Sequence, residues 1–377
     1  MNFNYSEEQT LLKDSVSRFI QNDYDYETRK KHCAMDGGFD AATWQTFAEL
    51  GWLCVPFSEE DGGIGGGAVE TMIMMEEFGK GLVVEPYVST VLIAGGLLAK
   101  VGNAEQKSEI LAGIIDGSRK LALAAVEPQS RFDLFDVQTT ATSSAEGYQL
   151  NGAKAMVLHG GSADTFIVSA RTAGDSRDRE GVSLFLVPAD SDGIERQDFP
   201  TLDGHRAAEL TLSNVKVPAA ALLGTDGAAV PALESIADEA AVALAAEAVG
   251  MMEKLYRETV EYSQNRKQFG VPISAFQALQ HRMVDMFTLH EECKSLLLRA
   301  VMSHKAGDAD FSKNVSALKY AVAVKGQKVA HEAIQIFGGM GMTDEMSVGM
   351  YLKRINVINT LFGNGDYHLK RFISLSV

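Results

Sequence analysis

Four long segments with the 3.6-residue spacing of apolar side chains occupy the last third of the chain, and they constrain its fold more than any other feature. They span roughly 229–265, 275–306, 312–337 and 347–359. Long helices that follow one another through short turns pack as antiparallel neighbours. We therefore expect a four-helix bundle in the C-terminal region.

The middle third of the sequence changes to a two-residue period. Short runs, many with alternating apolar residues, fall at 120–126, 137–141, 148–150, 165–170, 182–187 and 208–215, and Gly, Asp and Ser separate them. Such closely spaced short runs predict an antiparallel β-sandwich or a small barrel. The charged stretch 171–180 is then a solvated hairpin loop.

The first third is again helical. The residues Ser6 to Gln9 form a capping-box pattern before an amphipathic run, and further helical patterns cover 41–50, 68–79, 88–101 and 104–115. The order of helices, strands and helices predicts an α+β fold. We expect an N-terminal helical domain at 1–119, a central β-domain at 120–226 and a C-terminal helical bundle at 227–377.

Composition narrows the class of protein. The 377 residues carry a net charge of −16, which argues against nucleic acid and anionic membranes as partners. The three cysteines form no CxxC pair, so we expect neither a zinc site nor a disulfide framework, and a reducing cytoplasm fits best. No signal peptide and no apolar stretch long enough to span a membrane is expected.

Two segments in the last third have the chemistry of a phosphate-binding site. The run 335–343 (QIFGGMGMT) follows a helical pattern, and its glycines allow backbone N–H groups to approach a ligand closely. Upstream, Arg266 can bind a phosphate through two parallel hydrogen bonds, and Phe269 offers a flat apolar face. A purely structural interpretation, in which each segment ends a helix, stays open.

Taken together and in this order, the two segments resemble the acyl-CoA dehydrogenase family of flavoproteins, and the resemblance covers nearly the whole chain. It implies that FAD is the cofactor and lies at a subunit interface of an oligomer. Arg266, Gln268 and Phe269 would contact FAD held mainly by a neighbouring subunit, and Gln277 would lie on its adenine side. The remaining residues, at the pyrophosphate, would be Gln335, Gly338 and Gly339.

The resemblance extends to the β-domain, with departures. The segments 124–128 and 148–154 resemble those that precede and follow the flavin ring in the family. The family has an aromatic and a hydroxyl residue against the ring, whereas this chain has Met156 and Leu158, followed by His159. A lone histidine is more often structural than catalytic. The glycine-rich run 62–67 follows no strand and is expected to be a loop.

The family reaction removes a proton from Cα of an acyl-CoA thioester, and it needs a carboxylate base. The usual glutamate position falls on Asn364, and an amide cannot accept a proton at neutral pH. An alternative family position falls on Ala240. One or two turns later, Glu247 is the only charge in a long apolar helical run, so it is the first candidate for the base. The second is Asp366, in an expected flexible Gly-Asn-Gly-Asp loop.

A structural role for Glu247 stays open, as a buried ion pair with Arg282 or Arg299. The sequence around Glu247 and the ending LFGNGDYH look most like one branch of the acyl-CoA dehydrogenase family. That branch includes the small subunit of pimeloyl-CoA dehydrogenase and chains of bacterial steroid side-chain degradation. The resemblance implies a bulky or dicarboxylic acyl-CoA, an electron-transfer flavoprotein as acceptor, and a partner that is a copy of this chain or a homologue. The alternatives are a catalytically silent partner subunit and an oxidase that uses O₂.

Overall fold

A computed structural model of the chain describes residues 4–376, which form two compact units. Unit 1 contains residues 4–31, 67–83 and 241–376, and unit 2 contains residues 32–66 and 84–240. The first helical third of the sequence is thus divided between the two units. The domain boundaries expected after residues 119 and 226 stay a prediction.

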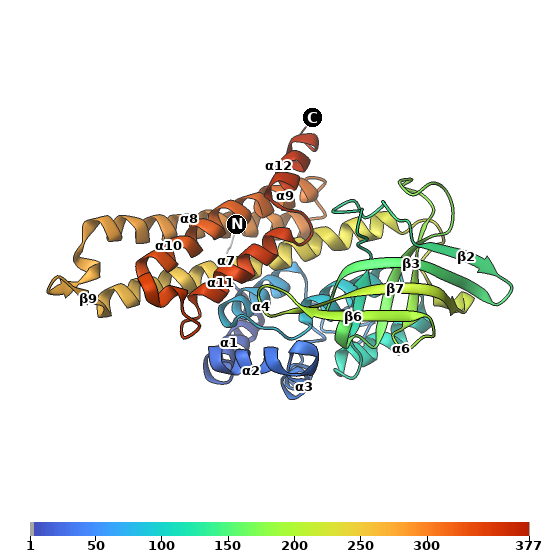
Figure 1. Cartoon of the computed structure of the whole chain (residues 1–377), viewed down its shortest axis with the longest axis horizontal. Helices are drawn as coiled ribbons and strands as arrows, with labels where there is room; N and C mark the ends of the chain where they lie inside the picture. Colours follow the sequence, from blue (N-terminus) through green and yellow to red (C-terminus); the bar gives the residue numbers. More distant parts are fainter. Residues whose placement is uncertain (1–3, 377) are drawn as a thin grey trace. The chain divides into compact units, whose positions relative to one another are not determined.

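Unit 1 is helical (Figure 1). The capping box predicted at Ser6 is confirmed, because its hydroxyl accepts from the Gln9 N–H and the Gln9 side chain accepts from the Ser6 N–H. The helices of this unit, two of which (α2 and α7) continue into unit 2, are α1 (Glu7–Asn22), α2 (Tyr26–Ala34), α4 (Ala68–Gly81), α7 (Val230–Asn265), α8 (Gln277–Lys305), α9 (Phe311–Ala321), the π-helical η6 (Val322–Gly326), α10 (Gln327–Phe337), the 3₁₀ turn η7 (Gly338–Met342), α11 (Val348–Thr360) and α12 (Gly365–Ser374).

The third predicted helix of the bundle is interrupted, since η6 separates α9 from α10. A π-helical turn inside a helix introduces one extra residue and often occurs at functional sites. The helices α8, α10 and α11 lie alongside one another, as Figure 1 shows. Two elements were not predicted from the sequence: α2 is almost entirely polar, and α12 begins in the run expected to be a loop.

The helices α4 and α7 cross at two glycines. A Cβ atom at Gly79 would clash with the backbone carbonyl of Glu247, and a Cβ at Gly250 would clash with the carbonyl of Glu76. Only glycine permits so close an approach of two helix backbones. The crossing fixes the position of Glu247 on α7.

Unit 2 contains one eight-stranded sheet in the order β6-β7-β3-β2-β4-β5-β8, with β1 paired to β4. The neighbours are antiparallel except that β1 and β2 pair with β4 in parallel. The strands are β1 (Leu121–Ala124), β2 (Thr140–Ser144), β3 (Gly147–Leu158), β4 (Thr165–Arg171), β5 (Val182–Pro188), β6 (Ile194–Pro200), β7 (Arg206–Val217) and β8 (Leu222–Leu223). The helical segments α3 (Ala41–Glu49), η2 (Tyr87–Gly95), α5 (Gly96–Val101) and α6 (Ala104–Ile115) belong to the same unit.

The stretch 171–180 is the hairpin loop between β4 and β5, as predicted, but its first residue is not solvated. Arg171 is 7% exposed and donates to the carbonyl of Ser176 in the loop and to those of Phe135 and Val137 in the segment before β2. The run 62–67 is also a loop, as predicted. Among the helices in residues 4–376, none has the length and apolar character required to cross a bilayer.

Cofactor segments and candidate active site

The two cofactor segments predicted from the sequence meet at an aromatic stack in unit 1. Tyr262, on the last turns of α7, and Phe337, at the end of α10, stack with ring centroids 4.2 Å apart and an interplanar angle of 14°. The Tyr262 hydroxyl also donates to the Phe337 carbonyl at 3.3 Å. The stack ties the chain just before Arg266 to the chain just before Gly338. A single ligand at this end of the bundle can therefore contact both segments.

The glycine turn after α10 is open toward solvent. Gly338 has φ +64° and ψ −141°, a conformation that residues with a Cβ avoid. A Cβ built on Gly338 or Gly339 meets no atom within 4 Å, and Gln335 is exposed. The turn thus exposes its backbone, and packing does not require glycine at either position.

The second segment forms a small hairpin, β9 (Lys267–Gln268) and β10 (Val271–Pro272). At its tip, Phe269 has φ +54° and is 91% exposed, with only an edge contact to the Phe276 ring. Arg266 is exposed, and no carboxylate in residues 4–376 pairs with it. An exposed ring beside an unpaired guanidinium is a surface ready to bind another group.

The remaining predicted contacts are also exposed. Gln268 donates only to the carbonyl of the preceding residue, and Gln277 begins α8. Within unit 1, the predicted cofactor residues are therefore all exposed and leave polar groups available. Their position on the surface is consistent with a ligand that belongs in part to another subunit.

In unit 2, a buried ion pair organises the segments that resemble the flavin-facing part of the family. Lys154 donates to Glu127 at 2.6 Å and to Ser169 Oγ at 3.0 Å, and Glu127 also accepts from the N–H groups of Gln138 and Thr139. These bonds hold the pKa of Glu127 at about 2 although burial opposes the charge, while burial lowers the pKa of Lys154 to about 8. The pair locks segment 124–128 to strand β3.

Strand β3 is irregular directly after this pair. Its register with β7 shifts between Lys154 and Val157, and Met156 has φ +52° and is 39% exposed. Bulges of this kind are common beside active sites because they redirect a side chain. His159, with φ +52°, is buried, and its ring meets that of His205 edge-on at 5.9 Å. This environment supports the structural interpretation of His159.

The candidate base Glu247 is engaged by an arginine of α11. Its Oε1 accepts from Arg354 Nε at 2.6 Å and its Oε2 accepts from Arg354 Nη2 at 2.8 Å, and both residues are at most 4% exposed. The partners named from the sequence are wrong: Arg282 pairs with Glu332, and the ion-pair partner is Arg354. Glu247 and Arg354 are 107 residues apart in the sequence, so no local pattern indicated this contact.

The second candidate, Asp366, lies in a helix and not in a flexible loop. Asn364, at the usual base position, is the N-cap of α12, and its Oδ1 accepts from the Tyr367 N–H at 2.9 Å. Asp366 is then in the first turn of α12, where a negative charge interacts favourably with the helix dipole. Asparagine is among the best N-cap residues, so the substituted position has acquired a structural role.

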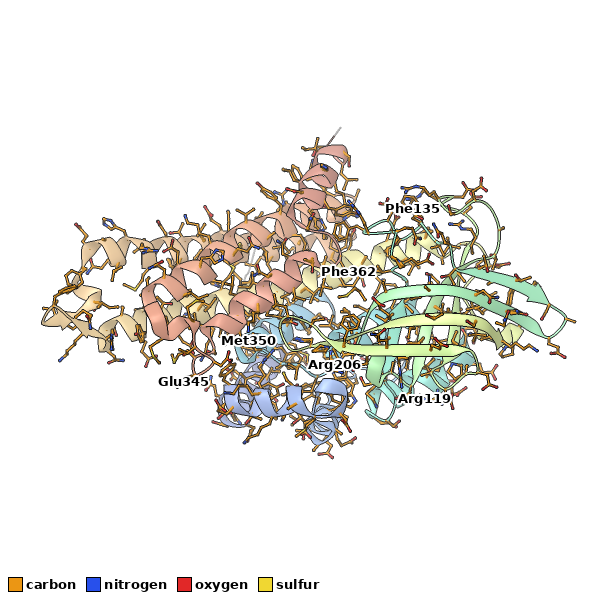
Figure 2. All side chains as sticks on the ribbon, in the orientation of Figure 1. Arg119, Phe135, Arg206, Glu345, Met350 and Phe362 are labelled. Carbon is orange, nitrogen blue, oxygen red and sulfur yellow. The ribbon has the colours of Figure 1, made fainter. Side chains whose placement is uncertain are left out.

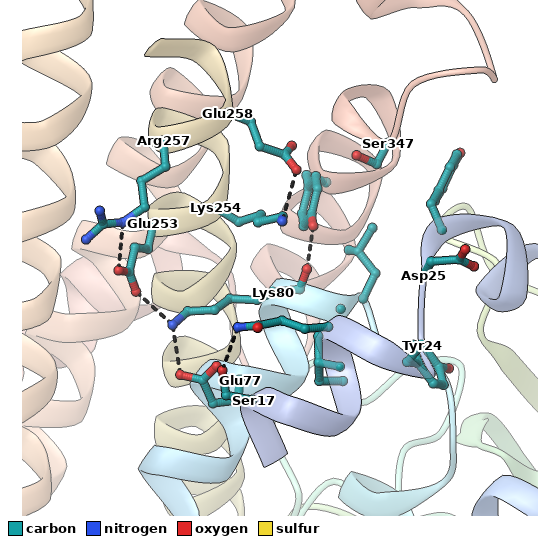
Figure 3. A pocket seen from close by; sticks show the side chains of 16 residues that line it. Ser17, Tyr24, Asp25, Glu77, Lys80, Glu253, Lys254, Arg257, Glu258 and Ser347 are labelled. Carbon is teal, nitrogen blue, oxygen red and sulfur yellow. Dashed lines mark hydrogen bonds and ion pairs between the residues drawn. The ribbon is translucent and has the colours of Figure 1, made fainter. Parts of the chain in front are cut away.

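A cavity of about 450 Å³ in unit 1 contains no candidate site (Figure 3). In it, Lys80 bridges Glu77 and Glu253 at 2.8 and 3.0 Å, and Arg257 also binds Glu253. Lys254 is likewise paired with Glu258, so none of these cations is left unpaired for an anionic ligand. Within residues 4–376, no group of three or more His, Cys, Asp or Glu side chains could hold a metal ion.

Three family models match: the N-terminal domain of acyl-CoA dehydrogenases over residues 6–118, the middle domain over 122–215 and the C-terminal domain over 230–373. The acyl-CoA dehydrogenase FadE12 of Mycobacterium tuberculosis is 30% identical over 91% of this chain and 89% of its own length. The chain belongs to the acyl-CoA dehydrogenase family. The probable acyl-CoA dehydrogenase YngJ of Bacillus subtilis is 29% identical over 99% and 98% of the two chains.

Solved structures agree in fold. Butyryl-CoA dehydrogenase from Megasphaera elsdenii has a TM-score of 0.92 at 27% identity and 99% coverage of both chains. The FAD complex of PigA has a TM-score of 0.92 at 27% identity and full coverage of both chains. The steroid ACAD Tcur3481-Tcur3483 has a TM-score of 0.87 at 29% identity, with 98% of both chains covered. The predicted α+β fold is confirmed, the chain is an oxidoreductase that acts on CH–CH bonds, and FAD is its cofactor.

Proposed function

We propose that this chain is a subunit of an FAD-dependent acyl-CoA dehydrogenase that introduces an α,β double bond into an acyl-CoA thioester. The observation that carries the proposal is the joint surface of Arg266, Phe269 and the Gly338–Gly339 turn, tied together by the stack of Tyr262 on Phe337. When bound, FAD supplies the acceptor for the hydride that leaves Cβ. The protein supplies binding, orientation and a base for the Cα proton.

The described residues fit this cofactor. The guanidinium of Arg266 is available for a bidentate bond with a phosphate, and the open backbone of the Gly338 turn can donate N–H groups to the same pyrophosphate. Since the stack of Tyr262 on Phe337 joins the chain just before Arg266 to the chain just before Gly338, we infer that both segments bind FAD at this end of the bundle. That FAD belongs mainly to a neighbouring subunit, so the active protein is an oligomer, dimeric at least.

The substrate that we propose is a bulky or dicarboxylic acyl-CoA. The likeness to a steroid ACAD at 29% identity supports this choice. A chain of the ChsE4-ChsE5 complex from Mycobacterium tuberculosis, at 25% identity with 99% and 98% of the chains covered and a TM-score of 0.89, supports assembly with an unlike subunit. The proposed electron acceptor is an electron-transfer flavoprotein, and the proposed compartment is the cytoplasm.

The proposed bases are Glu247 and Asp366, and the geometry constrains both. Each oxygen of Glu247 accepts one hydrogen bond from Arg354 and keeps a second lone pair, but a proton on Glu247 would remove the charge that pairs with the buried Arg354. Asp366 lies in the first turn of α12, two residues beyond the position that the family uses. The assignment stays a proposal, and paired variants can test it.

A second candidate function is a partner subunit that completes an assembly but supplies no base. Two observations favour it: the bidentate bond of Arg354 to Glu247, and the capping role of Asn364. In that case a homologous chain supplies the carboxylate. The exposed cofactor segments support a retained contribution to FAD binding under either proposal.

Anaerobic mixing of the purified protein with acyl-CoA thioesters tests the proposal. The panel should contain a short straight-chain, a dicarboxylic and a steroid side-chain thioester. We expect the flavin absorbance to bleach, fastest with one of the last two. Bleaching that occurs only after a homologous subunit is added would favour the second function. Reoxidation by O₂ as fast as by an electron-transfer flavoprotein would indicate an oxidase.

A further inference from the structure

The turn between α11 and α12 is held in place by a buried lysine of α9. Lys319 is 2% exposed, and its Nζ donates to the carbonyl of Ile358 at 2.7 Å and to that of Leu361 at 2.9 Å. Ile358 lies in the last turn of α11, and Leu361 is its C-cap. The last carbonyls of a helix have no i+4 partner within the helix. Among the backbone donors of residues 4–376, only the Leu361 N–H bonds to the Ile358 carbonyl, at 3.3 Å, and the lysine supplies a shorter bond to it and one to the Leu361 carbonyl.

A second buried side chain binds the other half of the same turn. His368 of α12 is fully buried, and its Nε2 lies 2.9 Å from the carbonyl of Phe362, the next residue along the turn. The pKa of His368 is lowered to about 3 by burial and by the charge of Lys319, so the neutral ring donates through Nε2. Its Nδ1 faces Ser316 Oγ of α9 at 3.4 Å.

The backbone of the turn has an unusual conformation that these contacts stabilise. Phe362 has φ +54° and Gly363 has φ +106°, and Figure 2 labels Phe362 where α11 gives way to α12. A residue with a Cβ adopts positive φ only when its surroundings require it. The contacts from Lys319 and Ser316 of α9 favour this conformation of the turn.

Burying the lysine side chain at this position carries a free-energy cost. Burial lowers its pKa to about 7, and the nearby Arg354 adds a second positive charge, so an apolar residue would pack with less penalty. No carboxylate in residues 4–376 forms an ion pair with Lys319 at the distance of a salt bridge. The hydrogen bonds of Lys319 to the carbonyls of Ile358 and Leu361 offset part of the free-energy cost of burying it.

We propose that Lys319 is a positioning residue: it fixes the Leu361–Asn364 turn, which carries the family's base position, so that the start of α12 keeps one place beside the acyl-CoA. The proposal rests on the proposed function of this chain. Lys319 acts through the turn and does not touch the reacting atoms. Gly365, the first residue of α12, packs closely on Ala323, four residues beyond Lys319, so the same stretch of chain sets both contacts.

Amide hydrogen exchange of the flavin-bound protein tests whether Lys319 stabilises the turn. In the wild type, the amides of Leu361, Gly365 and Tyr367 should be as protected as those inside α11. In Lys319→Met they should exchange about tenfold faster or more, while the amides of α8 stay unchanged. The matched control is Lys325→Met, six residues on, which removes a partly exposed ion pair with Glu292 and should leave the turn unchanged.

In catalysis, the loss of Lys319 should slow flavin reduction by acyl-CoA without releasing FAD. With FAD retained, Lys319→Met should bleach about 10- to 100-fold more slowly with acyl-CoA, because a displacement of about 1 Å at a site costs up to about 10²-fold. Turn amides that exchange as an open loop in the wild type would overturn the proposal, even if the variant fails to fold. Normal bleaching by a folded Lys319→Met would overturn it too. A wild type that no acyl-CoA bleaches, alone or with a homologous subunit, would contradict the proposed function, while the exchange result would still show whether Lys319 stabilises the turn.

Discussion

Arg354 binds both carboxylate oxygens of Glu247 and thereby links α11 to α7 inside unit 1. The contact joins the helix that precedes the Asn364 turn to the helix that crosses α4 at Gly250. A buried, bidentate ion pair is costly to break from one side, because the remaining charge is left without a partner.

The first prediction separates structure from catalysis at this pair. Glu247→Met alone should lower the free energy of unfolding by about 3–5 kcal/mol, since Arg354 stays buried and unpaired. The double variant Glu247→Met/Arg354→Met should recover most of that loss, because apolar residues of similar volume often replace a buried pair without penalty. Denaturant unfolding measures both values.

The folded double variant then tests the base. If the carboxylate serves only the ion pair, flavin bleaching by acyl-CoA should stay within about threefold of the wild type, well short of the roughly 10²–10⁴-fold of a general base. A loss in that larger range would assign the Cα proton to Glu247. Asp366→Asn is the comparison, and a large loss there alone would place the base on α12.

The second prediction concerns the affinity for FAD. Arg266→Ala removes a charge-assisted bond of about 1.5–3 kcal/mol, so the dissociation constant of FAD should rise about 10- to 100-fold. Flavin fluorescence after dialysis reports the loss. Lys267→Ala, at the next exposed position, is the control and should retain the cofactor. Equal retention by both variants would show that Arg266 does not contact FAD.

The third prediction uses two neighbouring glycines. Gly338→Ala forces a side chain into φ +64° and should destabilise the fold by about 1–3 kcal/mol. Gly339→Ala has no such strain and no neighbour within 4 Å, so its stability should be unchanged. Both variants should bind FAD more weakly if the cofactor lies against this backbone. Normal FAD binding by Gly339→Ala would remove that residue from the site.

The fourth prediction is a pH dependence. The pKa of Lys319 is about 7 in the folded chain and 10.5 in the unfolded chain, so between those values the unfolded chain binds one more proton. The free energy of unfolding should therefore rise with pH across this window. The rise should be steeper in the wild type than in Lys319→Met, in which the other titrating groups are the same. Identical pH profiles would show that Lys319 titrates as an exposed lysine.

Much of the fold could be predicted from apolar periodicity, because that signal is local. The four long C-terminal patterns and most strands fall where the sequence places them. Strand β6 and helix α2 were missed since they are largely exposed and lack an apolar face. The sequence run Gly363 to Asp366 predicted a loop, whereas Asn364 uses its amide to begin α12.

Only those parts of the site that form sequence motifs could be predicted. The cofactor segments were recognisable from their residue types, but the stack of Tyr262 on Phe337 depends on the tertiary fold. The ion-pair partner of Glu247 and the bonds of Lys319 also join residues far apart in sequence. Single-chain periodicity contains no information on which of several arginines reaches a buried carboxylate.

The most direct test of the account is the visible spectrum of the purified protein before and after anaerobic addition of acyl-CoA. We predict bound flavin that is bleached by a dicarboxylic or bulky thioester, in this chain alone or together with a homologous subunit. A protein that binds FAD but is bleached by none of these thioesters, with or without the partner, would contradict the proposed dehydrogenase function.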